Sequence, residues 1–144
     1  MYKTVLCIDP SLKQSGIAVV KDGAVVYKTT ASGLSGNFNI IKNIIKTYKP
    51  DLIIKESPYC GPNKITFRRL SEVHGCIQLL AELYNIPVKE YTPSVGKKVA
   101  GTSTRDKDSK DKVNKFVNDY FNISIINNDI TDALVLYIAY VKEG

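Results

Sequence analysis

Four acidic side chains stand at positions where folding could bring them together. Asp9 and Glu56 each end a short apolar run, and Asp129 and Asp132 lie three residues apart. Residues with that spacing share one face of a helix, so the second pair would point the same way from a first helical turn. Carboxylate oxygens without histidine or cysteine partners are ligands typical of Mg²⁺ or Mn²⁺. Two such ions about 4 Å apart support in-line hydrolysis of a phosphodiester bond, because one activates water and the other stabilises the leaving oxygen.

Each acid also has a simpler structural explanation. Asp9, which precedes Pro10, could belong to a turn that follows a strand. Asp129 could cap a helix, and Asp132 could interact with the positive end of the helix dipole. Glu56 is harder to explain in this way, because its strand should be covered on both faces. Two unit charges about 5 Å apart repel by about 3 kcal/mol at an effective dielectric near 20, so a cluster of four carboxylates would need cations. Together the four acids favour metal binding.

The composition favours one intracellular domain that binds a polyanion. The chain has 144 residues, 44% of them hydrophobic, and its formal net charge is +6. This length suits one core, and the positive charge favours an anionic partner. Cys7, Cys60 and Cys76 are widely spaced, which fits reduced thiols better than a zinc site or a disulfide framework. No apolar run reaches the ~18 to 20 residues of a membrane span, so we expect a cytoplasmic protein with no membrane partner.

Alternating and helical periodicities predict five strands and four helices. The predicted strands are residues 3–9, 16–20, 24–29, 51–56 and 88–91, and the predicted helices are 38–48, 64–84 and two that follow the apolar spacing of 113–120 and 130–141. Residues 32–36 would be a spacer. The first three strands form an antiparallel meander, and crossovers place the last two parallel to the first. We therefore expect an α/β fold over residues 1–144, a ribonuclease H-like mixed five-stranded sheet with helices on both faces. In this order Asp9 and Glu56 leave the same end of neighbouring strands.

A polar, basic stretch connects the last strand to the last two helices. Residues 92–109 include Gly96 and Gly101, and residues 97–112 hold six Lys or Arg against three Asp. Such a segment offers little to pack, so we expect 97–112 to be mobile without a bound polyanion and ordered with one.

The acidic motifs resemble those of the RuvC family of Holliday junction resolvases. The resemblance runs from about residue 3 to residue 141 and is closest in length to compact, phage-type members. It rests on Ile8-Asp9-Pro10 with Ser15-Gly16, on Glu56 after Pro50-Asp51-Leu52-Ile53-Ile54, on Asp129-x-x-Asp132-Ala133, and on Thr92-Pro93-Ser94 and Lys110-x-x-Val113 between them.

The resemblance implies a structure-selective endonuclease. Such an enzyme is a homodimer that nicks two strands of a four-way DNA junction, depends on two Mg²⁺ ions that Mn²⁺ can replace, and acts in a bacterial or phage-infected cytoplasm. Asp9, Glu56, Asp129 and Asp132 would be catalytic metal ligands, and Lys110 a catalytic or phosphate-contacting lysine. Ser11 and Ser57 depart from the residues usual in the family. The basic residue expected after Thr92-Pro93-Ser94 falls on Lys97 or Lys98, one position away from its usual place.

Basic and aromatic residues near these motifs are candidates for DNA contacts. The DNA-binding residues that we expect are Tyr59, Lys64, Arg68, Arg69, Lys97, Lys98, Lys107 and Lys112. The three cations of residues 64–69 oppose the dipole of their own helix, which indicates phosphate binding, although an Arg68–Glu72 pair on a solvated face is the alternative. Tyr59 could stack on an unpaired base at a branch point, or it could cover the edge of the core.

Two further expectations concern the helix predicted at residues 64–84. His74, the one histidine, borders the apolar stripe of this helix, which indicates a packed or interface residue rather than a general base. This helix, with its apolar stripe of Leu70, Val73, Ile77 and Leu80, is the expected dimer contact.

Two other functions remain open from the sequence alone. The first is a ribonuclease H-like nuclease that acts on RNA or on an RNA/DNA hybrid. The second is an inactive nucleotide-binding module, because residues 9–16 loosely resemble the phosphate loop of actin-like ATPases. That fold needs two such domains, and 144 residues are too few for them.

Overall fold

Alternating apolar side chains build the strands at the centre of the molecule. The computed structural model describes residues 2–144. Its strands are β1 (Thr4–Asp9), β2 (Ser15–Lys21), β3 (Ala24–Ala31), β4 (Leu52–Glu56) and β5 (Val88–Tyr91), and its helices are α1 (Gly33–Tyr48), α2 (Lys64–Leu83), α3 (Pro93–Val99), α4 (Ser109–Phe121) and α5 (Asn128–Glu143). The five predicted strands and four predicted helices are confirmed, and α3 is an addition.

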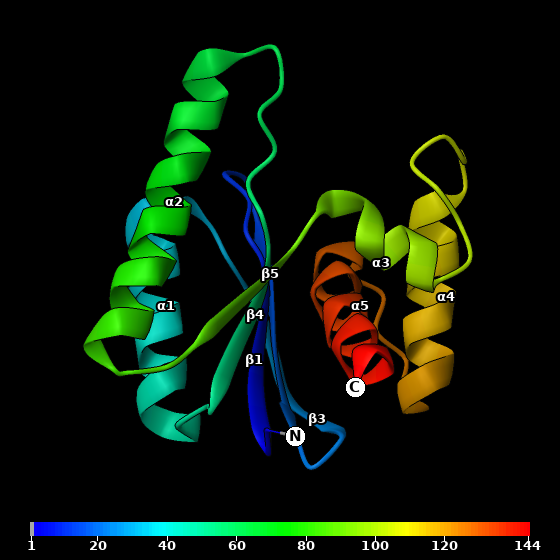
Figure 1. Cartoon of the computed structure of the whole chain (residues 1–144), viewed down its shortest axis with the longest axis horizontal. Coiled ribbons are helices and arrows are strands. Elements are labelled where there is room, and N and C mark those ends of the chain that lie inside the picture. The colour runs from blue at the N-terminus through cyan, green and yellow to red at the C-terminus, as the bar shows by residue number, and fades with distance from the viewer. Residues whose placement is uncertain (1) are drawn as a thin grey trace.

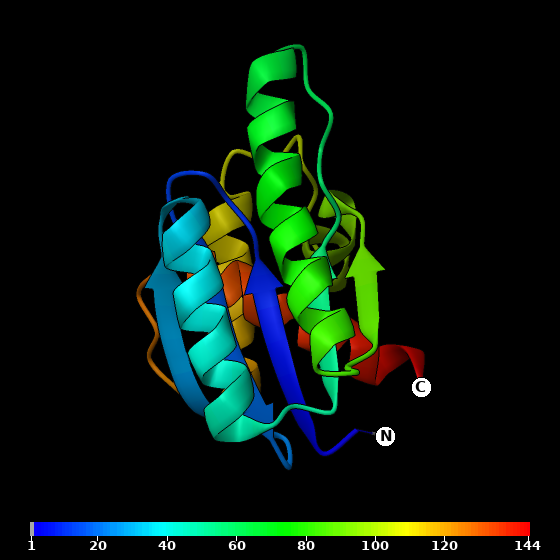
Figure 2. The ribbon, with the colours of Figure 1, turned by 90° about the vertical axis from the view of Figure 1, so that its left-hand side faces the viewer.

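The five strands form the predicted mixed sheet. Their order is β3-β2-β1-β4-β5, with β1–β2 and β2–β3 antiparallel and β1–β4 and β4–β5 parallel. Helices α1 and α2 cover one face, and α5, with α3 and α4 outside it, covers the other (Figures 1 and 2). The expected ribonuclease H-like arrangement is therefore confirmed. Because β1 and β4 are parallel neighbours, their last residues, Asp9 and Glu56, lie at the same end of the sheet.

The alternation along β1 assigns each side chain to one of two cores. Leu6 and Ile8 pack with α1 and α2, whereas Val5 and Cys7 pack with α5. Asp9 continues the second series, since successive side chains of a strand point to opposite faces. The same rule places Ile54 and Glu56 of β4 on the α5 face.

Among residues 2–144, no helix is long and apolar enough to cross a membrane.

Helix α1 begins earlier than the sequence predicts. Residues 33–36 were expected to be a spacer because they are rich in glycine and serine, but they form the first turn of α1. Gly33 has a φ of 72°, which turns the chain from β3 into the helix. Asn37 is buried and donates from Nδ2 to the carbonyl oxygen of Gly33 at 2.6 Å. This local bond stabilises a turn that has little apolar periodicity.

Helix α3 occupies most of the first half of the polar stretch 92–109. Pro93 occupies an early helical position, where its missing N–H costs nothing, and Gly96 packs directly against Val135 of α5. A Cβ atom at Gly96 would lie 2.6 Å from Cγ1 of Val135. Lys97 lies on α3 and Lys110 on α4, so both ends of 97–112 are helical, and the mobility expected for this segment stays a prediction. The glycine that suggested flexibility permits a close helix contact instead.

The apolar stripe of α2 serves the core and not a second subunit. Val73, Ile77 and Leu80 are buried against α1 and the sheet, so these side chains are not available to a second subunit, and a dimer contact elsewhere on α2 stays a prediction. Other apolar side chains of α2 stay exposed, notably Leu79 and Leu83. Periodicity identified an apolar face, but α2 carries apolar residues on two faces.

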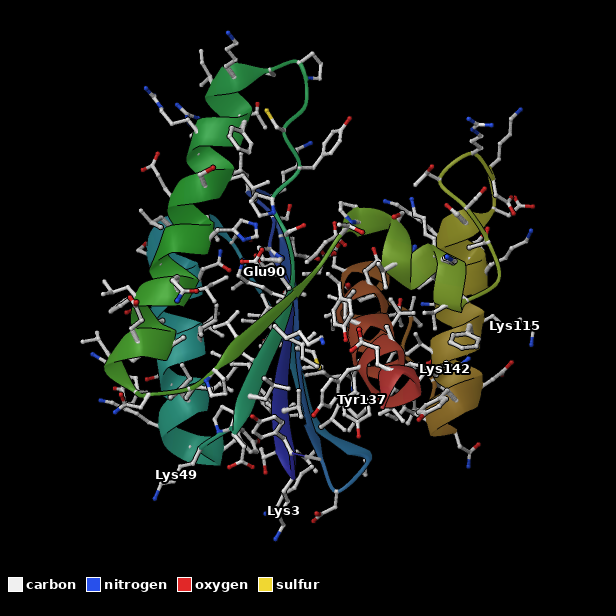
Figure 3. The ribbon with its side chains drawn as sticks, in the orientation of Figure 1. Lys3, Lys49, Glu90, Lys115, Tyr137 and Lys142 are labelled. Carbon is white, nitrogen blue, oxygen red and sulfur yellow. The ribbon has the colours of Figure 1, made fainter. Side chains whose placement is uncertain are left out.

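A buried lysine joins β4 to α2 and β5. Lys55 is 2% exposed, and its Nζ lies 2.7 Å from Nδ1 of His74 and 3.1 Å from Oε1 of Glu90. Glu90 lies on the α2 side of the sheet and is half-exposed (Figure 3). Burial, together with the Lys55 ammonium, lowers the pKa of His74 to about 4, so the imidazole is neutral and accepts from the ammonium. His74 is therefore a packed histidine, as predicted.

We expect His74→Leu alone to lower the free energy of unfolding by about 2 kcal/mol, because it leaves a buried ammonium with one partner fewer. Lys55→Met combined with His74→Leu should return to within about 1 kcal/mol of wild type, since replacing a whole buried polar pair by apolar residues is nearly neutral. Urea titration of the two single variants and the double variant measures this non-additivity. Losses that simply add would show that Lys55 and His74 contribute independently.

Candidate metal centre

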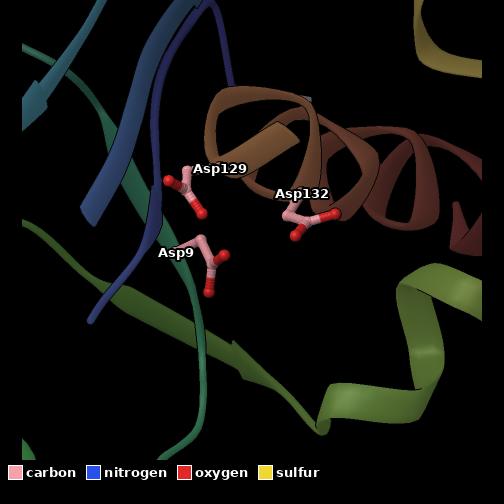
Figure 4. A group of neighbouring side chains, drawn as sticks. All are labelled: Asp9, Asp129 and Asp132. Atoms are coloured by element: carbon pink, nitrogen blue, oxygen red, sulfur yellow. The ribbon is translucent and has the colours of Figure 1, made fainter. Parts of the chain in front are cut away.

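Three aspartates meet where the end of β1 approaches the start of α5. One carboxylate oxygen from each of Asp9, Asp129 and Asp132 lies within 4.8 Å of the others, and all three residues are partly buried. Figure 4 shows Asp9 coming from the strand side and the other two from the first turns of α5. The predicted convergence of these three acids is confirmed.

A glycine makes this approach possible. Gly16 on β2 pairs with Asp9 across the β1–β2 ladder. A Cβ atom at Gly16 would lie 1.8 Å from the carbonyl oxygen of Asp129, so only glycine lets α5 descend this far onto the sheet. The cap of α5 is Asn127, whose Oδ1 accepts from the N–H groups of Asp129 and Ile130. Asp129 is thus not the cap, and its carboxylate is free to face Asp9.

Glu56 lies with Asp9 and Asp132 in a cleft that also holds two lysines. The cleft, of about 130 Å³, is lined by Asp9, Glu56, Pro93, Gly96, Lys97, Lys110, Val113, Asp132 and Val135. Glu56 is not part of the tight group of three, but it faces the same space as Asp9 and Asp132. The four predicted ligands therefore form a group of three with a fourth acid beside it.

The surroundings in the cleft disfavour ionisation of its carboxyl groups. Burial, followed by the charges of Glu56, Asp132 and Asp129, raises the pKa of Asp9 well above its usual range. Burial and the charge of Asp132 raise the pKa of Glu56 to about 7, and burial is the main cause that raises the pKa of Asp132 to about 6. The charge of Lys110 lowers the pKa of Asp9 and Asp132, and that of Lys97 lowers the pKa of Glu56 and Asp132. Two lysines compensate only part of the repulsion.

The structure separates the lysines that the sequence grouped together. Lys97 lines the cleft, whereas its neighbour Lys98 is exposed and does not. Lys110, in the first turn of α4, also lines the cleft. Lys107 is exposed in the turns of residues 100–108, and Lys112 forms an ion pair with Asp106. Only Lys97 and Lys110 of this basic region reach the acids.

The remaining predicted DNA contacts lie on the end of α2 that projects beyond the sheet. Lys64, Arg68 and Arg69 are exposed there, outside the cleft (Figure 2). Among residues 2–144, the ion pairs do not include the alternative Arg68–Glu72 pair. Tyr59, in the loop before α2, is 68% exposed, so it does not cover the core.

Some residues of the cleft were not among the predicted site residues. Pro93, Gly96 and Val135 line it, and none of them has chemistry that marks a site. The sequence could show that Lys97, and not Lys98, faces the cleft only if α3 were predicted, because the helix determines which of two adjacent lysines points inward. A proline after Thr92 was an available indication of a helix start.

We expect Glu56→Gln to stabilise the metal-free protein at pH 8 and to have little effect at pH 5. A carboxyl group whose pKa is raised on folding binds more protons in the native state, so its contribution to stability is lost as pH rises from about 4.5 through 7. A shift of this size corresponds to about 3 kcal/mol at most. Thermal melting in chelator measures the difference, and Glu82→Gln, which changes an exposed acid of α2, is the control. A glutamine variant that is less stable than wild type at pH 8 would contradict the crowding.

Comparison with known proteins identifies the family. The family model for crossover junction endodeoxyribonuclease RuvC matches residues 5–140. RuvC of Chlamydia felis is 33% identical over 100% of this chain and 95% of its own length, and RuvC of Brachyspira hyodysenteriae is 29% identical over 96% and 94%. The structure described as T. thermophilus RuvC in complex with Holliday junction substrate shares the fold, with a TM-score of 0.83 over 99% of this chain and 96% of that chain at 14% identity. The chain belongs to the RuvC family of crossover junction endodeoxyribonucleases.

Proposed function

We propose that this chain resolves four-way DNA junctions by Mg²⁺-dependent hydrolysis of phosphodiester bonds. The observation that carries the proposal is the cleft in which Asp9, Glu56 and Asp132 face Lys97 and Lys110. Such a reaction needs two components. Anionic groups bind the metal cations, and lysines bind the phosphate. Membership of the RuvC family supports the junction as the substrate.

The donor set fits a small divalent cation. Oxygens bound to one Mg²⁺ ion at about 2.1 Å lie no more than about 4 Å apart. The oxygens of Asp9, Asp129 and Asp132 lie within 4.8 Å of one another, so small side-chain rotations would suffice. Glu56 would complete a second site beside Asp9. When bound, two ions would activate a water molecule and stabilise the leaving oxygen, and Mn²⁺ would substitute for Mg²⁺.

The lysines of the cleft would act on the phosphate. Lys97 approaches from α3 and Lys110 from α4, so the two cations come from separate elements. A phosphoryl group gains negative charge in its transition state, and preorganised cations stabilise that charge. Pro93 and Gly96 contribute no long side chain to the cleft, which leaves room for a DNA backbone.

The projecting end of α2 would bind the arms of the junction. Lys64, Arg68 and Arg69 offer three exposed cations to phosphates there. Tyr59 is exposed in a loop between two prolines, and stacking of a base on its ring would be worth about 1 to 3 kcal/mol. Bases at a branch point are already partly unstacked, so this contact would favour junctions over duplex DNA. Lys98, Lys107 and Lys112 would contribute to the general attraction of DNA.

A homodimer would supply the second active site that paired incisions need. A groove between α1 and α2 is lined by Leu34, Ser35, Phe38, Glu72, Gly75, Cys76 and Leu79. Leu79 is 53% exposed, and Leu34 of α1 is exposed beside it on this groove. Exposed apolar side chains on two adjacent helices are typical of a protein interface. We propose this face as the dimer contact, in place of the buried stripe of α2.

The other functions considered from the sequence have less support. A hybrid-cleaving nuclease would use the same acids, but the curated relatives reported above are named crossover junction endodeoxyribonucleases. A nucleotide-binding module would not require Glu56, Asp129 and Asp132 to surround Asp9. A cytoplasmic location stays a prediction.

We expect Asp9→Asn, Glu56→Gln, Asp129→Asn and Asp132→Asn each to reduce junction nicking by more than about 100-fold, while junction binding survives or tightens. Metal activation is lost, and the repulsion between the carboxylates and DNA phosphate falls. Gel assays of nicking and binding, with Mg²⁺ and with chelator, measure both quantities on a four-way junction, a linear duplex and an RNA/DNA hybrid. Asp119→Asn on the outer face of α4 is the control. Loss of binding in parallel with cleavage in all four variants would refute the assignment, and preferred cleavage of the hybrid would favour the alternative nuclease.

The adjacent pair Lys97 and Lys98 provides a matched test of the cleft. We expect Lys97→Ala to lower turnover at saturating junction by at least about tenfold, because a transition-state contact is lost. Lys98→Ala should leave turnover close to wild type and slightly reduce the salt dependence of binding. Single-turnover cleavage and binding across a salt series separate the two effects. Equal losses of turnover in both variants would contradict the assignment of Lys97 to the cleft.

Leu79→Glu should convert the dimer into a monomer. A buried carboxylate at a small apolar interface would be unpaired and costly. Light scattering at micromolar concentration measures the state, and a cruciform plasmid distinguishes paired incisions from single nicks. Ile126→Glu, at an exposed isoleucine outside the groove, is the control. A wild-type monomer that still makes paired incisions would refute the dimer.

A further inference from the structure

The side chain of Asn127 connects the start of α5 to the loop that follows Asp9. Its Oδ1 accepts from the N–H groups of Asp129 at 2.8 Å and Ile130 at 3.1 Å, which caps the helix. Its Nδ2 donates to Oε1 of Gln14 at 3.1 Å. Gln14 is 113 residues away in sequence, so this one bond joins the two segments that carry the facing aspartates.

The loop that carries Gln14 is itself fixed. Oγ of buried Ser15 accepts from the N–H of Ser11 at 3.0 Å and donates to the carbonyl oxygen of Ser11 at 3.2 Å. The backbone on both sides of Gln14 is therefore restrained. A bond from Gln14 to Asn127 restrains the helix cap relative to the end of β1.

These contacts close a ring around the two aspartates. Asp9 pairs with Gly16, and Gly16 touches the backbone of Asp129. Asn127 caps the turn that holds Asp129, and its bond to Gln14 leads back to the loop after Asp9. Gly16 limits how closely α5 can approach, because its contact with the Asp129 carbonyl is already tight. The Gln14–Asn127 bond limits the opposite movement. Repulsion between Asp9 and Asp129 favours that separation when no cation is bound.

We propose that Gln14 and Asn127 are positioning residues that hold Asp129 at the distance from Asp9 that a shared divalent cation requires. Neither side chain is a metal ligand in this account. The inference rests on the metal site of the proposed function and adds the contact that preorganises it. Partners that orient metal ligands commonly change metal affinity about 10- to 100-fold.

Gln14→Met and Asn127→Ser test this role without removing the cap. Methionine matches the size of glutamine but has only a weakly accepting sulfur in place of the amide oxygen that accepts from Asn127, and serine keeps an oxygen for the helix N–H groups but does not reach Gln14. Titration calorimetry with Mn²⁺ measures metal affinity, and thermal melting in chelator measures the metal-free fold. Gln78→Met, at the other glutamine of the chain, is the control for the exchange, because residue 78 is exposed on α2.

We expect each variant to bind Mn²⁺ about tenfold more weakly than wild type. The metal-free melting temperature should stay within about 2 °C of wild type, because relief of the repulsion offsets the lost hydrogen bond. The double variant should bind Mn²⁺ no more weakly than the weaker single variant, since either change breaks the same bond.

Three results would overturn the proposal. Wild-type affinity for Mn²⁺ in Gln14→Met would show that the bond does not position Asp129. Losses of affinity that add in the double variant would show two independent effects. A wild-type chain that binds no Mn²⁺, while Gln14→Met only loses stability, would remove the metal site of the proposed function and leave the bond a purely structural one.

Discussion

Repulsion among half-buried carboxylates is the constraint on which the rest of this structure depends. Burial and mutual charge raise the pKa of Asp9, Glu56 and Asp132, so the metal-free cleft opposes its own ionisation. The fold nevertheless brings these acids together through the parallel β1–β4 pair and the close contact of α5 with Gly16. Packing of the sheet and α5 thus supplies the free energy that holds an unfavourable charge cluster, and a bound cation would convert that cost into affinity.

The same constraint explains why the cleft is assembled from distant parts of the chain. Asp9 and Glu56 come from strand ends, Asp129 and Asp132 from one helix, and the compensating lysines from two further helices. Rigid elements hold charged groups at fixed separations better than loops do. Helix α3 is short, but the contact of Gly96 with Val135 fixes it on α5 and so directs Lys97 inward.

Much of this arrangement follows from local sequence patterns. Alternation along residues 4–9 and 52–56, with the crossover rule, predicts that Asp9 and Glu56 share one end of the sheet. The three-residue spacing of Asp129 and Asp132 predicts their common direction. These predictions are correct because strand and helix periodicity determine where a side chain points once the topology is known.

Other features depend on contacts between distant residues, which periodicity does not encode. Helix α3 is stabilised by packing on α5. The local sequence does not show this contact, and Gly96 taken alone suggests flexibility. The apolar stripe of α2 could pack against the core or against a second subunit, and in the structure it packs against the core. Lys55 ends an apolar run and looks solvent-exposed by type, yet His74 and Glu90 provide buried partners. In each case the contact that determines the structure joins residues that are far apart in the sequence.

A crystal structure of the wild-type chain grown with Mn²⁺ would test the shared metal centre most directly, because anomalous scattering locates the ion without reference to activity. We expect a peak bound by carboxylate oxygens of Asp9, Asp129 and Asp132, with a second beside Glu56 when a junction is present. Mn²⁺ bound only elsewhere, with these carboxylates free and apart, would contradict it.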